Sequence, residues 1–212
     1  MRSPISALPA ERLLDIQKGT MRYSWRGVMC NKSPFELALY PMLLWQVKPA
    51  TIFEIGSKFG GSALWLADTC EMFGLPVKVI SVDINQRAEV RHPAVTFLQG
   101  NGRKLEDTLT DDLIGGLPRP WLVIEDADHL YETTLAVLKF FDRHLQAGEY
   151  ILVEDGIVDS FGKPDRFNGG PNKAVSEFMA EKAGTYELDT EYNDFFGYNA
   201  SWNTNGYLKR IA

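Results

Sequence analysis

The sequence is poor in cysteine, with only Cys30 and Cys70 among its 212 residues. Two isolated cysteines form neither a disulfide framework nor a CxxC metal knuckle. We therefore expect two buried free thiols, which suit the reducing environment of the cytoplasm.

The sequence also lacks any apolar run near the roughly 20 residues that a membrane-spanning helix needs. Its first residues lack the apolar centre of a secretory signal. The formal net charge is −6, and no stretch concentrates lysine and arginine. We therefore expect a cytoplasmic protein that binds neither membranes nor nucleic acids.

The length predicts one domain over residues 1–212, in which a helical segment, 1–49, precedes an α/β core, 50–212. In the core, short apolar segments alternate with helical patterns. This alternation is typical of a Rossmann-like, mainly parallel sheet with helices on both faces. Two late extended segments would add a C-terminal antiparallel hairpin and bring the sheet to seven strands. We expect strands at 51–55, 78–83, 95–99, 121–125, 150–154, 186–192 and 206–211, and helices at 60–73, 131–145 and after Pro171.

The segment before the core contains two helical patterns. A short amphipathic helix is expected over 9–18. A second helix should begin after Ser33, because Pro34 suits the first helical position and Glu36 lies three residues past the cap. It should end before Pro49.

The first core strand ends in a glycine-rich turn, Glu54-Ile-Gly-Ser-Lys-Phe-Gly-Gly-Ser62. Three residues separate its first two glycines, which differs from the GxGxxG spacing of dinucleotide sites. A carboxylate at the strand end repels phosphate but suits the ammonium and sulfonium groups of S-adenosylmethionine. A plain strand-to-helix turn is the alternative. The residues that we expect to bind this cofactor are Glu54, Gly56, Gly60, Gly61 and Ser62.

Polar residues also end the next two strands. Asp83 is expected to accept hydrogen bonds from the ribose hydroxyls, although a helix cap or a surface charge would use the same residue. Asn101, in Gly-Asn-Gly, is expected near the adenine, although this tripeptide is also ordinary turn chemistry.

Acidic residues end the last two parallel strands of the predicted sheet. Asp126 follows one strand, and Glu154 and Asp155 end the other. Neighbouring strands lie about 4.8 Å apart, so these carboxylates should converge. Gathered carboxylates require a compensating cation, and oxygen ligands favour Mg²⁺, with Ca²⁺ or Mn²⁺ as alternatives. Solvated loop carboxylates that cap helices are the other interpretation.

Further residues near these strand ends are candidates for catalysis. Either His129 or the neighbouring carboxylate of Asp126 is expected to act as the general base. Alternatively, His129 orders the site or caps its own helix. The long glycine-rich connection 156–170 is a candidate lid. Lys32 is expected to be solvated or to approach the acceptor. The aromatic residues expected either to line the acceptor pocket or to pack the C-terminal hairpin are Tyr192, Phe195, Phe196, Tyr198 and Trp202.

From about Trp25 to the C-terminus, the chain resembles the cephalosporin hydroxylase/rhamnosyl O-methyltransferase family. The resemblance implies a class I methyltransferase fold that uses S-adenosylmethionine, with Glu54, Gly56 and Asp83 at the cofactor. It also implies a divalent metal at Asp126, Glu154 and Asp155. Ser57-Lys-Phe59 departs from the more usual choices in the cofactor turn. The matching segments are Trp25–Gly27, Lys32–Pro34, Glu54–Ala63, Asp126–His129, Val153–Asp155, Gly170–Pro171, Ala174–Val175 and Asn205–Arg210.

We therefore predict a metal-assisted O-methyltransferase that uses S-adenosylmethionine and forms a homo-oligomer. Its acceptor would be the hydroxyl of a small molecule, either a sugar of a glycosylated natural product or a phenolic or polyketide hydroxyl. The competing hypotheses are a metal-independent N- or C-methyltransferase, a nicotinamide-dependent oxidoreductase and a non-catalytic Rossmann-like module.

Overall fold

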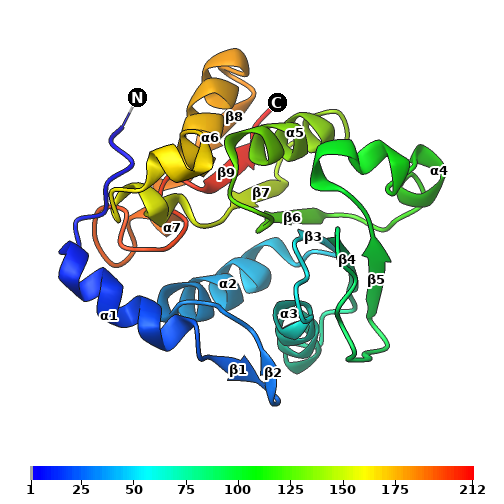
Figure 1. Cartoon of the computed structure of the whole chain (residues 1–212). Coiled ribbons are helices and arrows are strands. Elements are labelled where there is room, and N and C mark those ends of the chain that lie inside the picture. The colour runs from blue at the N-terminus through cyan, green and yellow to red at the C-terminus, as the bar shows by residue number, and fades with distance from the viewer. Residues whose placement is uncertain (1) are drawn as a thin grey trace.

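The computed structural model describes residues 2–212, and its centre is a seven-stranded sheet (Figure 1). The strands are β3 (Thr51–Ile55), β4 (Lys78–Asp83), β5 (Val95–Gln99), β6 (Trp121–Glu125), β7 (Tyr150–Val153), β8 (Tyr186–Leu188) and β9 (Tyr207–Arg210). Their order is β5-β4-β3-β6-β7-β9-β8, with β3 to β7 parallel and β9 antiparallel to both of its neighbours. The predicted mainly parallel sheet is confirmed.

Helices cover both faces of the sheet (Figure 1). One face packs against α2 (Pro34–Val47) and α3 (Gly61–Met72), and the other against α5 (Tyr131–Asp142) and α6 (Gly170–Glu181). Alternate residues of each strand enter the two resulting cores. Phe53 and Val123 belong to the α5–α6 side, whereas Ile52 and Leu122 belong to the α2–α3 side. Because both faces are buried, most residues of the central strands are apolar, and Glu54 and Glu125 are buried exceptions near the strand ends.

The segment before the sheet contains a hairpin as well as the two predicted helices. The helices are α1 (Ala10–Thr20) and α2. Between them, β1 (Ser24–Trp25) pairs with β2 (Val28–Met29) in antiparallel fashion. The turn consists of Arg26 and Gly27, both with positive φ, which is the backbone that a two-residue hairpin needs.

The two C-terminal strands pair as predicted, but no tight turn joins them. The short helix α7 (Thr190–Asn193) and an irregular segment, 194–206, lie between β8 and β9. The predicted strand over 186–192 is therefore wrong from residue 189. The chain turns into a helix there because the side chain of Asp189 accepts the N–H of Glu191 and caps α7.

The predicted N-cap of α2 forms, but its glutamate has a second use. Ser33 accepts the N–H of Phe35, and Pro34 begins the helix. Glu36 accepts the hydroxyl of Ser33 and the distant N–H of Trp202. Its carboxyl group therefore fastens the C-terminal loop to the start of α2, in the interior of the protein.

We expect Glu36 to make stability fall as pH rises. Burial raises the pKa of Glu36 from 4.5 to about 7. Between pH 4.5 and 7 this carboxyl group is therefore ionised in the unfolded state and still protonated in the folded state. The free energy of unfolding falls over this range, and the stabilisation from the protonated carboxyl group is lost as pH passes the folded pKa. Relative to Glu36→Gln, the free energy of unfolding should fall by about 3 kcal/mol over this range.

Urea denaturation at several pH values measures this difference. Glu106→Gln, at an exposed carboxyl group, is the control and should leave the pH dependence unchanged. Parallel pH curves for the wild type and Glu36→Gln would contradict the assignment.

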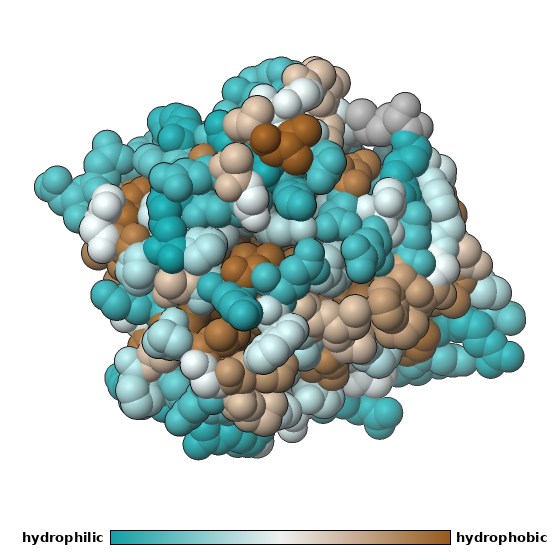
Figure 2. All heavy atoms as spheres, turned by 180° about the vertical axis from the view of Figure 1, so that it is seen from behind, coloured by the Kyte–Doolittle hydropathy of each residue, from teal (hydrophilic) through white to brown (hydrophobic). Residues whose placement is uncertain are grey.

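No helix within residues 2–212 is long and apolar enough to cross a membrane. Figure 2 shows the hydrophobic residues of the rear face as separate patches among hydrophilic ones. Cys30 and Cys70 are both buried and free, as predicted. The homo-oligomer stays a prediction.

Candidate active site

A cavity of about 520 Å³ lies at the carboxyl ends of the parallel strands. Ile55, Val82 and the residues after β5, β6 and β7 contribute to its wall. This is the position at which open α/β sheets bind their ligands. The predicted site residues that line it are Gly56, Ser62, Asp83, Asn101, Asp126, His129 and Asp155.

Strand register brings the glycine turn and the acidic residues to one level. Ile55 pairs with Glu125 of β6, and Glu125 pairs with Val153 of β7. Gly56, directly after Ile55, has φ +114°. A Cβ atom on Gly56 would lie 1.9 Å from the backbone oxygen of Asp126. The turn and the acidic edge therefore meet only because this residue is glycine.

The other two glycines of the turn are packing residues. A Cβ atom on Gly60 would meet the ring of Phe97 at 2.8 Å, and one on Gly61 would meet the backbone oxygen of Met29 at 2.2 Å. Neither glycine lines the cavity. They let α3 approach β5 and the hairpin closely, so the structure supports a positioning role for both.

Glu54 lies beneath the cavity rather than in its wall. It is fully buried, and one of its oxygens accepts the hydroxyl of Ser81, which also contacts the hydroxyl of Ser57 at 2.6 Å. The second oxygen, Oε1, has no hydrogen-bond partner among the described residues. Burial raises the pKa of this carboxyl group. An unsatisfied buried acceptor below the glycine turn suits a positively charged ligand above it.

Asp83 and Asn101 combine hydrogen bonds to nearby backbone N–H groups with a place in the cavity wall. The carboxylate of Asp83 accepts the N–H groups of Lys58 and Asn85, which holds the glycine turn against the end of β4. Asn101 accepts the N–H of Arg103 and caps η1 (Gly102–Asp107). Asp83 caps no helix, because none lies between β4 and β5. Asn101 does cap η1, and both residues face the cavity.

The acidic edge of the cavity contains Asp126, His129 and Asp155, which offer donor atoms within 4.8 Å of one another. His129 Nε2 lies 3.3 Å from Asp155 Oδ2. Burial lowers the pKa of His129, but the negative charges of Asp155 and Asp126 outweigh this effect, so the pKa of His129 is raised overall. His129 has positive φ (59°), and Leu130 is the N-cap residue of α5. The alternative of a histidine that caps this helix is therefore not supported.

Lys32 lies buried behind this edge, contrary to both expectations for it. Its Nζ is 2.6 Å from Asp126 Oδ2 and 2.6 Å from each carboxylate oxygen of Glu154. Tyr40 donates its hydroxyl to the same carboxylate, at 2.6 Å. Burial lowers the pKa of Lys32, but Asp126 and Glu154 outweigh this effect and hold it well above its usual value. Glu154 is thus separated from the donor group of Asp126 and Asp155 by a lysine ammonium.

Two segments close the outer side of the cavity. The candidate lid, 156–170, folds into η2 (Gly156–Asp159) and η3 (Pro164–Phe167), and Ile157, Phe161 and Phe167 face the cavity. The sequence did not indicate the second segment, α1, which contributes Leu14, Gln17 and Thr20 together with its C-cap residue Met21.

Most of the candidate aromatic residues pack elsewhere. Only Trp202 lines the cavity, and its indole N–H binds Gln17 of α1 at 2.6 Å. Tyr192 stacks on Tyr207, with ring centroids 5.5 Å apart. Phe195, Phe196 and Tyr198 are partly exposed and do not line the cavity. The prediction that all five aromatic residues line the acceptor pocket is therefore wrong.

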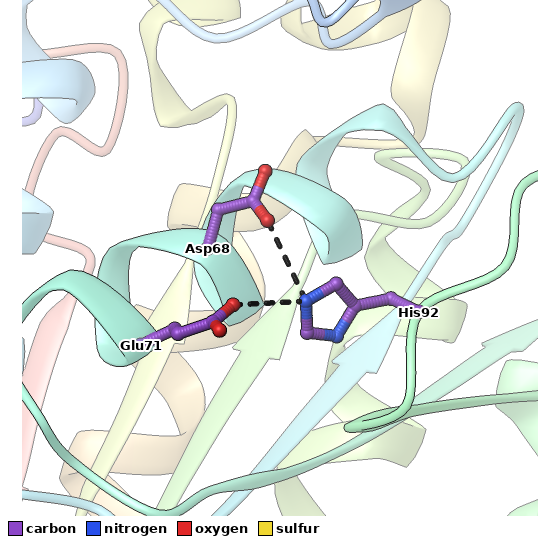
Figure 3. A group of neighbouring side chains, drawn as sticks. All are labelled: Asp68, Glu71 and His92. Carbon is purple, nitrogen blue, oxygen red and sulfur yellow. Dashed lines mark ion pairs between the residues drawn. The ribbon is translucent and has the colours of Figure 1, made fainter.

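A second group of ionisable side chains, Asp68, Glu71 and His92, lies on α3 and the connection before β5 (Figure 3). His92 Nδ1 accepts the N–H of Ala94, so Nε2 carries the proton and faces both carboxylates at 3.5 Å. Asp68 also accepts the indole N–H of Trp25 at 2.6 Å. This group fastens the β1–β2 hairpin and the chain before β5 to α3, which agrees with a structural role for His92.

The rhamnosyl O-methyltransferase/CmcI family model matches residues 17–211. The chain belongs to this family. It is 32% identical over 192 residues to the rhamnosyl O-methyltransferase of Mycobacterium leprae, which covers 88% of this chain and 82% of the relative. The methyltransferase family thus accounts for nearly the whole sequence, as the resemblance implied.

Solved CmcI structures share the fold of this methyltransferase. One, solved with Mg and SAM, is 27% identical with a TM-score of 0.73, covering 91% of this chain and 78% of that one. Another, with SAH, is 25% identical with a TM-score of 0.71, covering 97% and 93%. The chain is therefore an S-adenosylmethionine-dependent O-methyltransferase with the Rossmann-like fold of that class.

Proposed function

We propose that the protein transfers the methyl group of S-adenosylmethionine to a hydroxyl of a small glycosylated or sugar-like acceptor, with the help of a divalent cation. The main observation in support of this proposal is that Asp126, His129 and Asp155 face the same cavity as the glycine turn. Relatives named rhamnosyl O-methyltransferase support a sugar acceptor.

The cofactor would lie along the carboxyl ends of β3, β4 and β5. Glu54 supplies negative charge beneath it, Gly56 lets it approach the backbone, and Asp83 accepts from its ribose hydroxyls. Gly60, Gly61 and Ser62 shape the turn and the start of α3. Asn101 would border the adenine.

The donor set of the acidic edge fits a hard divalent cation such as Mg²⁺. Asp126 and Asp155 would hold it from the cavity side, and Glu154 would be a third ligand if Lys32 released one of its oxygens. Such an ion, when bound, lowers the pKa of a hydroxyl at this edge.

His129 is proposed as the general base. In the transfer, the acceptor oxygen forms a bond to the methyl carbon as the carbon–sulfur bond breaks, and the hydroxyl proton passes to His129. Asp155, 3.3 Å away, stabilises the imidazolium that results. Much of the rate would come from holding the oxygen in line with the methyl group.

Incubation with S-adenosylmethionine and 4-nitrophenyl α-L-rhamnoside tests this function. We expect S-adenosylhomocysteine and a product one methylene heavier, both lost with EDTA and restored by Mg²⁺. Turnover that EDTA does not change would favour a metal-independent methyltransferase. Binding of NAD instead of S-adenosylhomocysteine would overturn the proposal.

We expect Asp83→Asn to weaken S-adenosylhomocysteine binding about tenfold, since a charged acceptor of the ribose hydroxyls is lost. Titration calorimetry measures the affinity. Asp107→Asn, at an exposed carboxylate on the next connection, should leave it unchanged. Equal affinities for Asp83→Asn and wild type would remove Asp83 from the cofactor site.

A further inference from the structure

Lys32 is the most deeply buried ammonium group near the acidic edge, with 1% of its side chain exposed. It immediately precedes the N-cap of α2, so the start of that helix fixes its backbone. All three donors of an ammonium are accounted for by its contacts with Asp126 and Glu154. Lys32 therefore has no donor left for an acceptor or for the cofactor.

The charges around Lys32 explain why it is there. Among the described residues, no other lysine or arginine forms an ion pair with Asp126 or Glu154. Within residues 2–212, Asp155 has only His129 as an ion-pair partner. A buried carboxylate without a counter-charge is strongly unfavourable. The ammonium of Lys32 supplies that counter-charge to the buried Glu154 and to the partly exposed Asp126.

We propose that Lys32 is a resident counter-cation: it stabilises the acidic edge without a divalent ion, and it weakens the binding of that ion. The two positive charges compete for Asp126 and Glu154, so each lowers the affinity of the other. The competition rests on the proposed metal site, whereas the stabilisation does not. Lys32 is therefore a positioning residue that sets cation affinity.

Lys32→Met tests both statements, because methionine keeps an unbranched side chain, one heavy atom shorter than that of lysine, and removes its charge. In EDTA, the Tm should fall by roughly 10 °C, since a buried pair is broken. Mn²⁺ should restore part of this loss. Calorimetry with Mn²⁺ alone should show an affinity that is on the order of tenfold higher than that of the wild type. Lys163→Met, an exposed lysine of the same cavity wall, is the matched control and should change neither value much.

The double variant Lys32→Met/Glu154→Gln keeps the test informative if the single variant does not fold. Its neutral pair should recover most of the Tm in EDTA. A double variant no more stable than Lys32→Met would overturn the proposal that Lys32 stabilises the acidic edge as a counter-cation. Weaker or equal Mn²⁺ binding by Lys32→Met would overturn the competition alone. If no variant, including the wild type, bound Mn²⁺, the metal site of the proposed function would fail together with the competition.

Discussion

Asp126→Asn is expected to lower turnover of 4-nitrophenyl α-L-rhamnoside by on the order of 10³. Asparagine keeps the shape of the side chain but removes the charge that faces His129 and the proposed cation. Lys32 keeps its contacts with both oxygens of Glu154, so the fold should persist. Formation of S-adenosylhomocysteine from S-adenosylmethionine, with saturating Mg²⁺, measures the loss.

The matched control for Asp126→Asn is Asp128→Asn. Asp128 also lines the cavity, but its carboxylate is half exposed and lies 3.7 Å from Arg103, away from the donor group. Its replacement should change turnover less than about threefold. Calorimetry with S-adenosylhomocysteine should give wild-type affinity for both variants. Turnover of Asp126→Asn above a tenth of the wild type would rule out its role in the chemistry.

Gly56→Ala should lower the free energy of unfolding by about 3 kcal/mol or more and abolish S-adenosylhomocysteine binding. The new Cβ atom would lie 1.9 Å from a backbone oxygen of Asp126, and no rotamer change can relieve a backbone contact. The turn or the end of β6 must move, which separates the cofactor turn from the acidic edge. Urea denaturation and calorimetry measure the two effects.

Gly74→Ala distinguishes this clash from the general cost of an alanine at positive φ. Gly74 has φ +67°, and its Cβ atom would have no neighbour within 4 Å. That variant should lose only about 1–2 kcal/mol and bind S-adenosylhomocysteine normally. Similar losses at both positions would mean that the contact between the turn and β6 is unimportant.

The sequence predicted the parts of the fold that depend on local pattern. The apolar runs of β3, β4 and β6 and the cap of α2 lie where expected, because their neighbours in sequence determine them. The helix at Thr190–Asn193 was missed although Asp189 is a recognisable cap. Tyr186 before Asp189 and Tyr192 after it favoured an extended segment instead.

The site was less predictable where its contacts are distant in sequence. Asp83 ends a strand, and Asp126 and Asp155 follow strands, so the strand-end rule found them. Lys32 contacts residues 94 and 122 positions away, and nothing in its neighbourhood indicates burial except the apolar helix that follows. The contribution of α1 to the cavity likewise depends on Trp202, at the other end of the chain.

The residues before α1 are fastened to the last part of the chain. Arg2 pairs with Asp194, the N–H of Ala7 binds the backbone oxygen of Tyr198, and Asn199 binds Ser3. Two of these contacts join residues 192 and 196 positions apart in the sequence. Contacts of such high sequence separation close long loops and slow folding, so we expect the segment before α1 to dock late in refolding, after the sheet has formed.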